Sequence, residues 1–565
     1  MEASPILKPD PKPASTKPKL GLRAWMERVL VECNRAADGF DAEAVHDLRV
    51  ALRRCRSLAD GLMAIDPNPS WKDMKRSGKK LFQALGELRD MQVMQEWIEK
   101  LSVDSSAAED AASRVSTEQP GDPVAIKLLD HVHAREAECK QHDFKDLNQF
   151  DRKQWRQWSR SLPRRAARVR PGSAVYLHVA LEKWTAAYEL HKRALRVRSQ
   201  VSWHALRIGI KRFRYTVENF LPHQHELWGD DLKELQDLLG EVHDLDVLWT
   251  TAVGVMAFAD AESQKRWRET LNAERTKRIE RYREKMVGRE SLWRVWRAEL
   301  PSGAQLRAAA LSRLRVWAGF LDPDFAHSQH VTQIALILYD GLRDLGLLPT
   351  NAGSPSLERN LNRNTIRSSS PSSSPSSSQS SEYDPRAVLQ AAAVMHDVGR
   401  AKGSENHQKT SYKMIRSLAR PLGWSARELE LAAVVARYHR GALPRPRGKI
   451  MQTLELPDRT TAVELAGILR LAKALDTHKQ HHGNQLRERA RNRKVIAIGP
   501  RLEIGLQERS VLLRVAGYSA LDRSAEEIAA ARHLLETVLG RPVLVRPLRA
   551  AAASRSTGRA SLTGQ

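Results

Sequence analysis

The sequence predicts a mainly α-helical protein with two helical regions and a small α+β segment near the C-terminus. Residues 20–300 show helical periodicity, many charges and few β-branched runs. Residues 304–484 continue with amphipathic helices of different composition, and short β-branched runs appear in 485–547. A chain of 565 residues exceeds what one ordinary core organises, which agrees with several domains.

The chain is strongly basic. It has 92 Lys and Arg against 67 Asp and Glu, which gives a formal net charge of +25. Such a field concentrates polyanions such as nucleic acid, polyphosphate or an acidic membrane surface. The alternative, that the excess charge only maintains solubility, is weaker if the cations are patterned rather than scattered.

The cysteines and the termini indicate a cytoplasmic protein. Cys33, Cys55 and Cys139 form an odd set without CxxC spacing, so neither a disulfide framework nor a thiolate metal site is indicated. Residues 1–19 lack the apolar segment of a signal peptide, and no run of about 18 apolar residues follows. We expect a soluble protein without a membrane partner, with a disordered Pro- and Lys-rich leader and a disordered tail at 548–565.

Two segments of the first region repeat one order of basic residues. HDLRVALRRCR at 46–56 and HALRIGIKRFR at 204–214 share His, Arg, a basic pair and Arg at identical spacing. At about 100° per residue, the cations of each segment share one helical face and the apolar residues another. FQALGELRD at 82–90 and QDLLGEVHD at 236–244 form a weaker second pair. The region is therefore predicted to be a duplicated helical unit.

A third basic stretch lies between the two copies. Residues 152–170 contain a run of Lys and Arg interleaved with Trp155 and Trp158. This run either adds to the positive surface or is an exposed, charged linker. The sequence leaves both interpretations open.

The paired HxxRxxxRRxR and HxxRxxxKRxR helices, each followed by an L-G-x-x-x-D segment, resemble the CHAD family (conserved histidine α-helical domain) over residues 20–300. The resemblance implies two helical bundles around a basic cavity that binds inorganic polyphosphate. Guanidinium and ammonium groups suit a linear polyanion, and salt should weaken the binding steeply. A nucleic-acid ligand is disfavoured because no helix-turn-helix, zinc-finger or RNA-recognition signature is visible. The residues implied to line the cavity are His46, Arg49, Arg53, Arg54, Arg56, His204, Arg207, Lys211, Arg212 and Arg214.

In the second region, His396 and Asp397 form an adjacent pair that closes the apolar segment AVLQAAAVMHDVGR. Packing alone does not favour two divalent-metal ligands there, although a lone pair also serves as an ordinary helix cap. His330 precedes the pair and Asp476 follows it, each on a separate predicted helix, so the four side chains are candidates for one metal site. The Ser/Pro-rich residues 351–383 are predicted to be a disordered insertion in this domain.

The order H…HD…D resembles the HD superfamily of metal-dependent phosphohydrolases. HDVGRAKGSENHQKTSYKMI, ELELAAVVARYHRGALP and LAGILRLAKALDTH are similar to the HD region at the C-terminal end of exopolyphosphatase and guanosine-pentaphosphatase proteins. This similarity spans residues 304–547, with an HD domain at 304–484 and a small α+β subdomain at 485–547. It implies a divalent-metal cofactor, Mn²⁺, Mg²⁺ or another ion, and two further phosphate or second-metal residues. The implied ligands are His330, His396, Asp397 and Asp476, and the two further residues are His407 and His439.

A divalent ion at such a site lowers the pKa of a bound water and polarises a phosphoryl oxygen. We expect Asp397 to orient that water and His439 and Arg400 to act beside it, with Lys473 as another candidate cation. The predicted function is polyphosphate binding combined with metal-dependent hydrolysis of polyphosphate or a related substrate. The alternative is a non-catalytic polyphosphate-binding or granule-targeting protein with a degenerate HD site.

Overall fold

The computed structural model describes residues 21–39, 42–110, 122–348, 383–445, 447–489 and 502–548. The chain divides into two compact units between Ser302 and Gly303. Helices dominate both units, and the described strands form one three-stranded sheet in the second, which confirms the predicted fold class. In the described part of the chain, no helix is both long and apolar enough to cross a membrane. The expected leader and nearly all of the expected insertion and tail lie outside the described residues.

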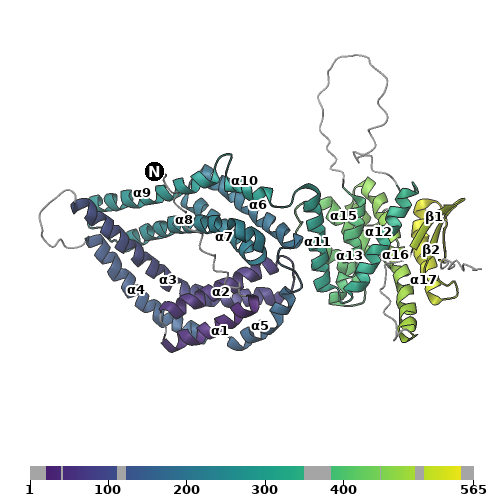
Figure 1. Cartoon of the computed structure of the whole chain (residues 1–565), viewed down its shortest axis with the longest axis horizontal. Helices are drawn as coiled ribbons and strands as arrows, with labels where there is room; N and C mark the ends of the chain where they lie inside the picture. Colours follow the sequence, from purple (N-terminus) through teal and green to yellow (C-terminus); the bar gives the residue numbers. More distant parts are fainter. Residues whose placement is uncertain are drawn as a thin grey trace, which may run out of the picture. The chain divides into compact units, whose positions relative to one another are not determined.

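The first unit contains two similar sets of four helices. In each set successive helices pack against each other, and α2 contacts α7 while α3 contacts α8 (Figure 1). The repeated segments therefore occupy equivalent helices, as the duplication predicts. The first set is α1 (Leu22–Gly39), α2 (Ala42–Leu62), α3 (Pro69–Asp110) and α4 (Pro123–Asn148). The second set is α6 (Ala174–Val197), α7 (Gln200–Phe220), α8 (Pro222–Gly254) and α9 (Ala261–Met286), while α5 (Arg152–Ala166) and α10 (Leu292–Ala298) complete the unit.

The repeated helices bury their apolar faces. Leu48 and Leu52 of α2 and Ile210 and Phe213 of α7 are buried, so the basic residues of each helix are directed elsewhere. Gly209 allows α7 to approach α6, because a Cβ there would lie 2.8 Å from a Leu190 methyl group and 3.3 Å from a backbone atom of α6. All three cysteines are buried, and none of them forms a disulfide within the described residues.

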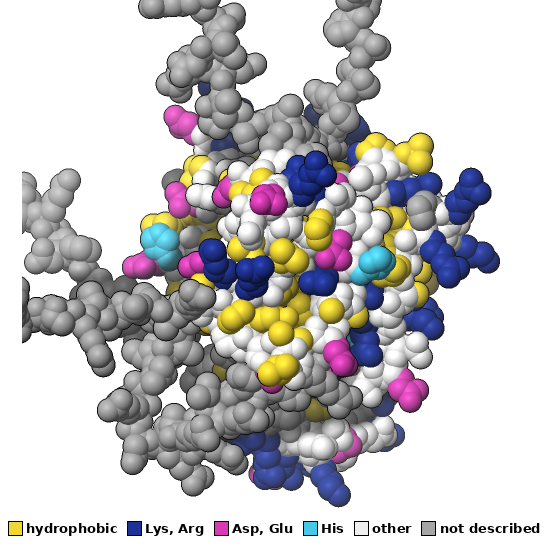
Figure 2. Space-filling view, turned by 90° about the vertical axis from the view of Figure 1, so that its right-hand side faces the viewer, with side chains coloured by type: hydrophobic (Ala, Val, Ile, Leu, Met, Phe, Trp, Pro, Cys, Tyr) yellow, Lys and Arg dark blue, Asp and Glu magenta, His cyan; other side chains and the backbone are white. Residues whose placement is uncertain are grey.

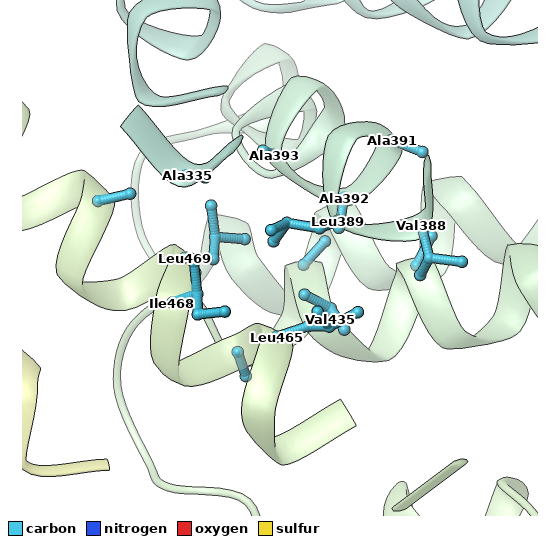
Figure 3. Close-up of a cluster of buried hydrophobic side chains, with 14 of the residues drawn as sticks. Ala335, Val388, Leu389, Ala391, Ala392, Ala393, Val435, Leu465, Ile468 and Leu469 are labelled. Atoms are coloured by element: carbon cyan, nitrogen blue, oxygen red, sulfur yellow. The ribbon is translucent and has the colours of Figure 1, made fainter. Parts of the chain in front are cut away.

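The second unit is built around α13 (Pro385–Met395). Its short apolar side chains meet Ala335 of α12, Val435 of α15 and Leu465 of α16 (Figure 3). Because α13 is buried on nearly all sides, its C-terminal end delivers His396 and Asp397 into the interior. The surrounding elements are α11 (Gly303–Leu321), α12 (Phe325–Asp344), η1 (Val398–Lys402), α14 (His407–Arg416), α15 (Ala426–Arg437), η2 (Met451–Thr453) and α16 (Leu456–Arg489).

A small sheet and one helix end the described chain. Strand β1 (Leu502–Gln507) pairs antiparallel with β2 (Ser510–Val515), and β2 pairs parallel with β3 (Val543–Pro547). Helix α17 (Arg523–Leu539) packs closely on α16, since a Cβ at Gly467 would lie 3.2 Å from the Cα of Leu535. These elements agree with the predicted α+β tail, while its first expected strand, at 494–499, lies outside the described residues.

Candidate functional site

Asp397 lies where α13 gives way to η1, and its side chain is 2% exposed. Its Oδ1 lies 3.3 Å from His396 Nε2, 3.1 Å from His407 Nε2 and 3.4 Å from His439 Nε2. The ammonium Nζ of Lys473, from α16, lies 3.1 Å from the same oxygen. Three imidazoles and one ammonium, contributed by separate elements, therefore surround one carboxylate.

The backbone orients these three imidazoles. In His396, His407 and His439, Nδ1 donates to the carbonyl oxygen three residues earlier, at 2.7, 2.8 and 2.7 Å. Burial, assisted by the nearby Lys473 charge, lowers the pKa of His396 to about 3 and that of His439 well below its usual value. Both rings are therefore neutral at pH 7, and their Nε2 lone pairs are directed toward the surroundings of Asp397.

The arrangement of donors fits a divalent metal ion. His396 Nε2 is buried and makes no hydrogen bond within the described residues. Ligand atoms of His327, His396 and Asp397 lie within 4.8 Å of one another, and so do those of Asp397, His407 and His439. Metal-ligating histidines characteristically have the outer ring nitrogen held by a carbonyl or carboxylate, as these do. Asp397 belongs to both groups.

The structure places His327, rather than the predicted His330, in the cluster around Asp397. His327 Nδ1 donates to Asp476 Oδ2 at 2.5 Å, which leaves its Nε2 for the site, and the side chain is 8% exposed. His330 hydrogen-bonds to the other Asp476 oxygen and is 32% exposed. Burial acts to raise the pKa of Asp476, but its two histidine partners lower it to about 2. His330 and Asp476 thus lie beside these two groups as hydrogen-bonding partners, and the predicted ligand set of His330, His396, Asp397 and Asp476 stays a prediction.

The sequence contained a signal for His327. This residue lies four positions before Val331 and seven before Ile334, so it continues the apolar stripe of α12. His330 lies at the edge of that stripe. A histidine within the buried stripe of a helix is better placed to reach an interior site than one beside it.

Two cations, Arg400 and Lys473, lie beside the Asp397 carboxylate. Burial acts to raise the pKa of Asp397, but His396, His407 and Lys473 lower it far below its usual value, so it stays ionised. Arg400 Nη1 lies 3.5 Å from Asp397 Oδ2. The residues predicted as catalytic, Asp397, His439 and Arg400, therefore lie within or next to one cluster, and Lys473 joins them.

Gly399 is required for the close approach of α14. A Cβ at this position would lie 2.2 Å from the His407 carbonyl oxygen and 2.6 Å from the Ser411 nitrogen. We expect Gly399→Ala to displace His407 from Asp397 and to lower the free energy of unfolding by about 1–3 kcal/mol, as overpacking typically does. Chemical denaturation measures the change. The control is Gly505→Ala, where a Cβ meets nothing within 4 Å, and equal stability of the two variants would contradict the expectation.

In the first unit, α2 and α7 border a cleft of about 430 Å³ that α3 and α8 complete. Arg49 and Arg207, from equivalent positions of the two repeats, line it together with Lys211. The Arg49 guanidinium stacks on Phe82 at 4.8 Å from the ring centre and donates to the Leu85 carbonyl. The cleft thus has cations from both repeats, and α3 holds the one from the first repeat, Arg49.

Lys211 shows that the basic faces of α2 and α7 meet. Burial lowers its pKa to about 8, and Arg207, Arg53, Arg56 and Arg49 act in the same direction. Cations of the two copies are therefore close enough to repel each other. An anion in the cleft would relieve this repulsion.

Asp90 and Asp244, which end the two L-G-x-x-x-D segments, also line the cleft, although the sequence did not place them there. Burial raises the pKa of Asp90, and it raises that of Asp244 to about 6, against the opposing effect of Arg207. Burial and Arg207 lower the pKa of the lining residue His243 to about 4. Its Nδ1 lies 3.3 Å from His204 Nδ1, so the second motif histidine reaches the cleft wall.

The other seven residues predicted to line the cavity are not among the lining residues of this cleft, and their part in binding stays a prediction. His46 and Arg212 are exposed and do not border the cleft. Arg54 forms an ion pair with Glu218. Arg54 and Arg212 each follow a stripe position by one residue, which turns them about 100° away from the stripe.

Comparisons with known families agree with the division of the chain into two units. Residues 22–253 match the CHAD domain family, and residues 368–508 match the family described as Ppx/GppA phosphatase, domain III. The chain joins a CHAD domain to a Ppx/GppA-like region. The second match begins after His327, which therefore lies outside the matched residues. Together, the CHAD domain and the Ppx/GppA-like region indicate a function related to polyphosphate.

Among solved structures, the crystal structure of the CHAD domain from the plant Ricinus communis is similar to this chain. The sequence identity is 22% and the TM-score is 0.30, over 49% of this chain and 88% of that chain. No curated protein sequence matches the chain.

Proposed function

We propose that the CHAD domain binds inorganic polyphosphate in the cleft between α2 and α7, and that the Ppx/GppA-like region is an HD-type phosphohydrolase. Its substrate would be polyphosphate or a related polyphosphorylated compound. The observation that carries the catalytic proposal is the set of imidazoles around the single buried carboxylate of Asp397. Within the described residues His396 Nε2 is buried without a hydrogen-bond partner, and because such burial costs free energy, packing alone does not account for it. The meeting of cations from both repeats at Lys211 supports the binding proposal.

The imidazole nitrogens suit ions such as Fe²⁺, Ni²⁺ or Zn²⁺ and the carboxylate suits Mn²⁺ or Mg²⁺, so the donor set fits a divalent ion without selecting one of them. His327, His396 and Asp397 would hold it, and His407 and His439 would complete a second position that shares Asp397. When bound, such an ion supplies charge that lowers the pKa of a water and polarises a phosphoryl oxygen.

The chain's own groups can assist hydrolysis in three ways. The Asp397 carboxylate can accept a hydrogen bond from the attacking water and orient it. When only the first position holds an ion, the neutral His439 has an Nε2 lone pair that can accept a hydrogen bond from the attacking water. Arg400 and Lys473 place positive charge beside the carboxylate, where negative charge on a phosphoryl group would develop.

Metal analysis separates this proposal from its alternative, a non-catalytic polyphosphate-binding or granule-targeting protein with a degenerate HD site. We expect the purified full chain to bind Mn²⁺ or Mg²⁺ and to release phosphate from polyphosphate only with the ion present. A chelator should abolish the release, and added ion should restore it. A protein that neither retains nor titrates a divalent ion would support the alternative.

Polyphosphate binding should weaken in two steps as pH rises. The pKa of Asp244 is raised to about 6, so above that pH it gains a negative charge in the cleft. The pKa of Lys211 is lowered to about 8, so above that pH a positive charge is lost. Between pH 5 and 9 the arginines stay charged and His243 stays neutral. Asp90, whose pKa burial raises, also opposes binding of an anion once it is ionised. Both steps therefore act in the same direction.

Binding of labelled polyphosphate between pH 5 and 9 at constant ionic strength measures this dependence. Asp244→Asn should remove the lower step only, and Lys211→Met the upper step only. Two variants that keep both wild-type steps would show that other groups control the binding.

A further inference from the structure

Helix α5 has a fixed orientation in the first unit. Trp155 on its inner face is fully buried, and its Nε1 donates to the Met26 carbonyl at 3.0 Å. Arg165 makes two hydrogen bonds with the buried carboxylate of Asp66, at 2.7 and 2.6 Å. These contacts hold one face of the helix inward, so the opposite face is turned to solvent.

That outer face carries a row of exposed cations. These cations are Lys153, Arg156, Arg160 and Arg164. They are spaced three, four and four residues apart, so they lie on one stripe that is roughly 16 Å long at 1.5 Å per residue. In the described part of the chain none of them forms an ion pair with a carboxylate, whereas Arg165 on the inner side does. A groove of about 560 Å³ runs along this face. Its lining residues are Lys153, Arg156, Gln157, Arg160, Ser161 and Arg164.

A row of unpaired like charges is unfavourable by itself. Like charges three or four residues apart repel each other and destabilise a helix. By contrast, on the face of the second unit in Figure 2, the described Lys and Arg side chains are dispersed among hydrophobic and acidic ones. A bound polyanion would turn the unfavourable row on α5 into a favourable one.

We propose that the outer face of α5 is a second binding surface for inorganic polyphosphate, separate from the cleft. It shares no lining residue with the cleft. A flexible linear polymer with charge on every unit can follow the row. A single-stranded nucleic acid fits less well, because Trp155 is buried and Trp158 packs beside it, with ring centres 6.2 Å apart, so the row offers no stacking platform. The ligand assignment rests on the proposed function of the CHAD domain.

Two surfaces for one polymer make affinity depend on chain length. A long chain that contacts both surfaces gains from the high effective concentration of its second segment, whereas a short chain contacts only one. The test is the full chain with Lys153→Gln, Arg156→Gln, Arg160→Gln and Arg164→Gln, titrated with tripolyphosphate and with long-chain polyphosphate. We expect unchanged tripolyphosphate affinity and a loss of about tenfold or more for the long chain, the lower end of avidity effects.

A matched control removes the same charge elsewhere on the first unit. Lys265→Gln, Lys277→Gln, Arg281→Gln and Arg283→Gln neutralise four exposed cations of α9. An equal loss of affinity for long-chain polyphosphate in the α5 and α9 variants, or no loss in either, would overturn the proposal. A larger loss of duplex DNA binding than of polyphosphate binding in the α5 variant would assign the face to nucleic acid and overturn it as well.

If polyphosphate does not bind in the cleft, the experiment gives a result that differs from a failure of the α5 proposal. In that case Arg49→Glu/Arg207→Glu would bind tripolyphosphate as the wild type does, whatever the α5 variant shows. A two-site variant, Lys153→Gln/Arg164→Gln, should show an intermediate long-chain affinity, and it keeps the test decisive if the four-site variant folds poorly.

Discussion

Asp397→Asn should lower metal-dependent phosphate release by more than roughly 100-fold. Loss of even an outer partner of a metal ligand typically costs 10- to 100-fold in metal affinity or activity, and Asp397 belongs to both candidate ligand groups. The asparagine side chain has nearly the same size but removes the charge that the surrounding imidazoles and Lys473 share. Metal content and phosphate release, both expressed per folded molecule, measure the effect.

Asp458→Asn is the matched control in the same unit. Asp458 is 1% exposed and accepts two hydrogen bonds from Arg427, at 2.6 and 2.9 Å, and one from Tyr383 at 2.7 Å. This variant should lose stability, because it disrupts a buried charged network, yet keep its metal and its activity per folded molecule. Phosphate release by Asp397→Asn at the wild-type rate would exclude the catalytic assignment.

Arg49→Glu/Arg207→Glu should abolish retention of polyphosphate by the cleft while the helices stay intact. Each hydrogen bond to a charged group contributes about 1.5–3 kcal/mol, so loss of two contacts predicts a decrease in affinity of at least about 100-fold. Reversal also adds carboxylates beside Asp90 and Asp244, which increases the repulsion of an anion. Tripolyphosphate titration measures binding by a chain too short to contact both surfaces, and far-UV circular dichroism confirms the fold.

Arg196→Glu/Arg212→Glu changes the charge by the same amount outside the cleft. Both residues are exposed, and neither borders the cleft, although Arg212 belongs to the repeated motif. This control should retain most of the tripolyphosphate affinity. Equal weakening of both variants would mean that net charge, rather than the cleft, determines binding.

The fold was largely predictable because its signals are local and repeated. The periodicity of 46–56 and 204–214 fixed which residues of α2 and α7 are buried, and Leu52 and Ile210 are. Short β-branched runs in 485–547 likewise indicated the small α+β segment in which β2 and β3 form. Such signals depend on each element's own sequence, so they do not require knowledge of its neighbours.

The candidate sites were only partly predictable because they depend on how helices are rotated against each other. On α12, two histidines three residues apart differ by about 60° around the helix, and packing against α16 decides which one turns inward. The same packing makes Asp476 a partner of His327 rather than a member of the cluster. Asp90 and Asp244 were missed because α3 and α8 are long, and the sequence does not show which of their turns borders the cleft.

The cations that α2 and α7 turn toward each other also concern the folding of the CHAD domain. Without an anion, the two repeats must hold together against their own mutual repulsion, which adds to the effect of burial in lowering the pKa of Lys211. A ligand that binds only the folded state stabilises it in proportion to the logarithm of its concentration. Bound polyphosphate would then contribute to the stability of the folded CHAD domain. The lifetime of the folded protein in a cell would depend on the concentration of polyphosphate.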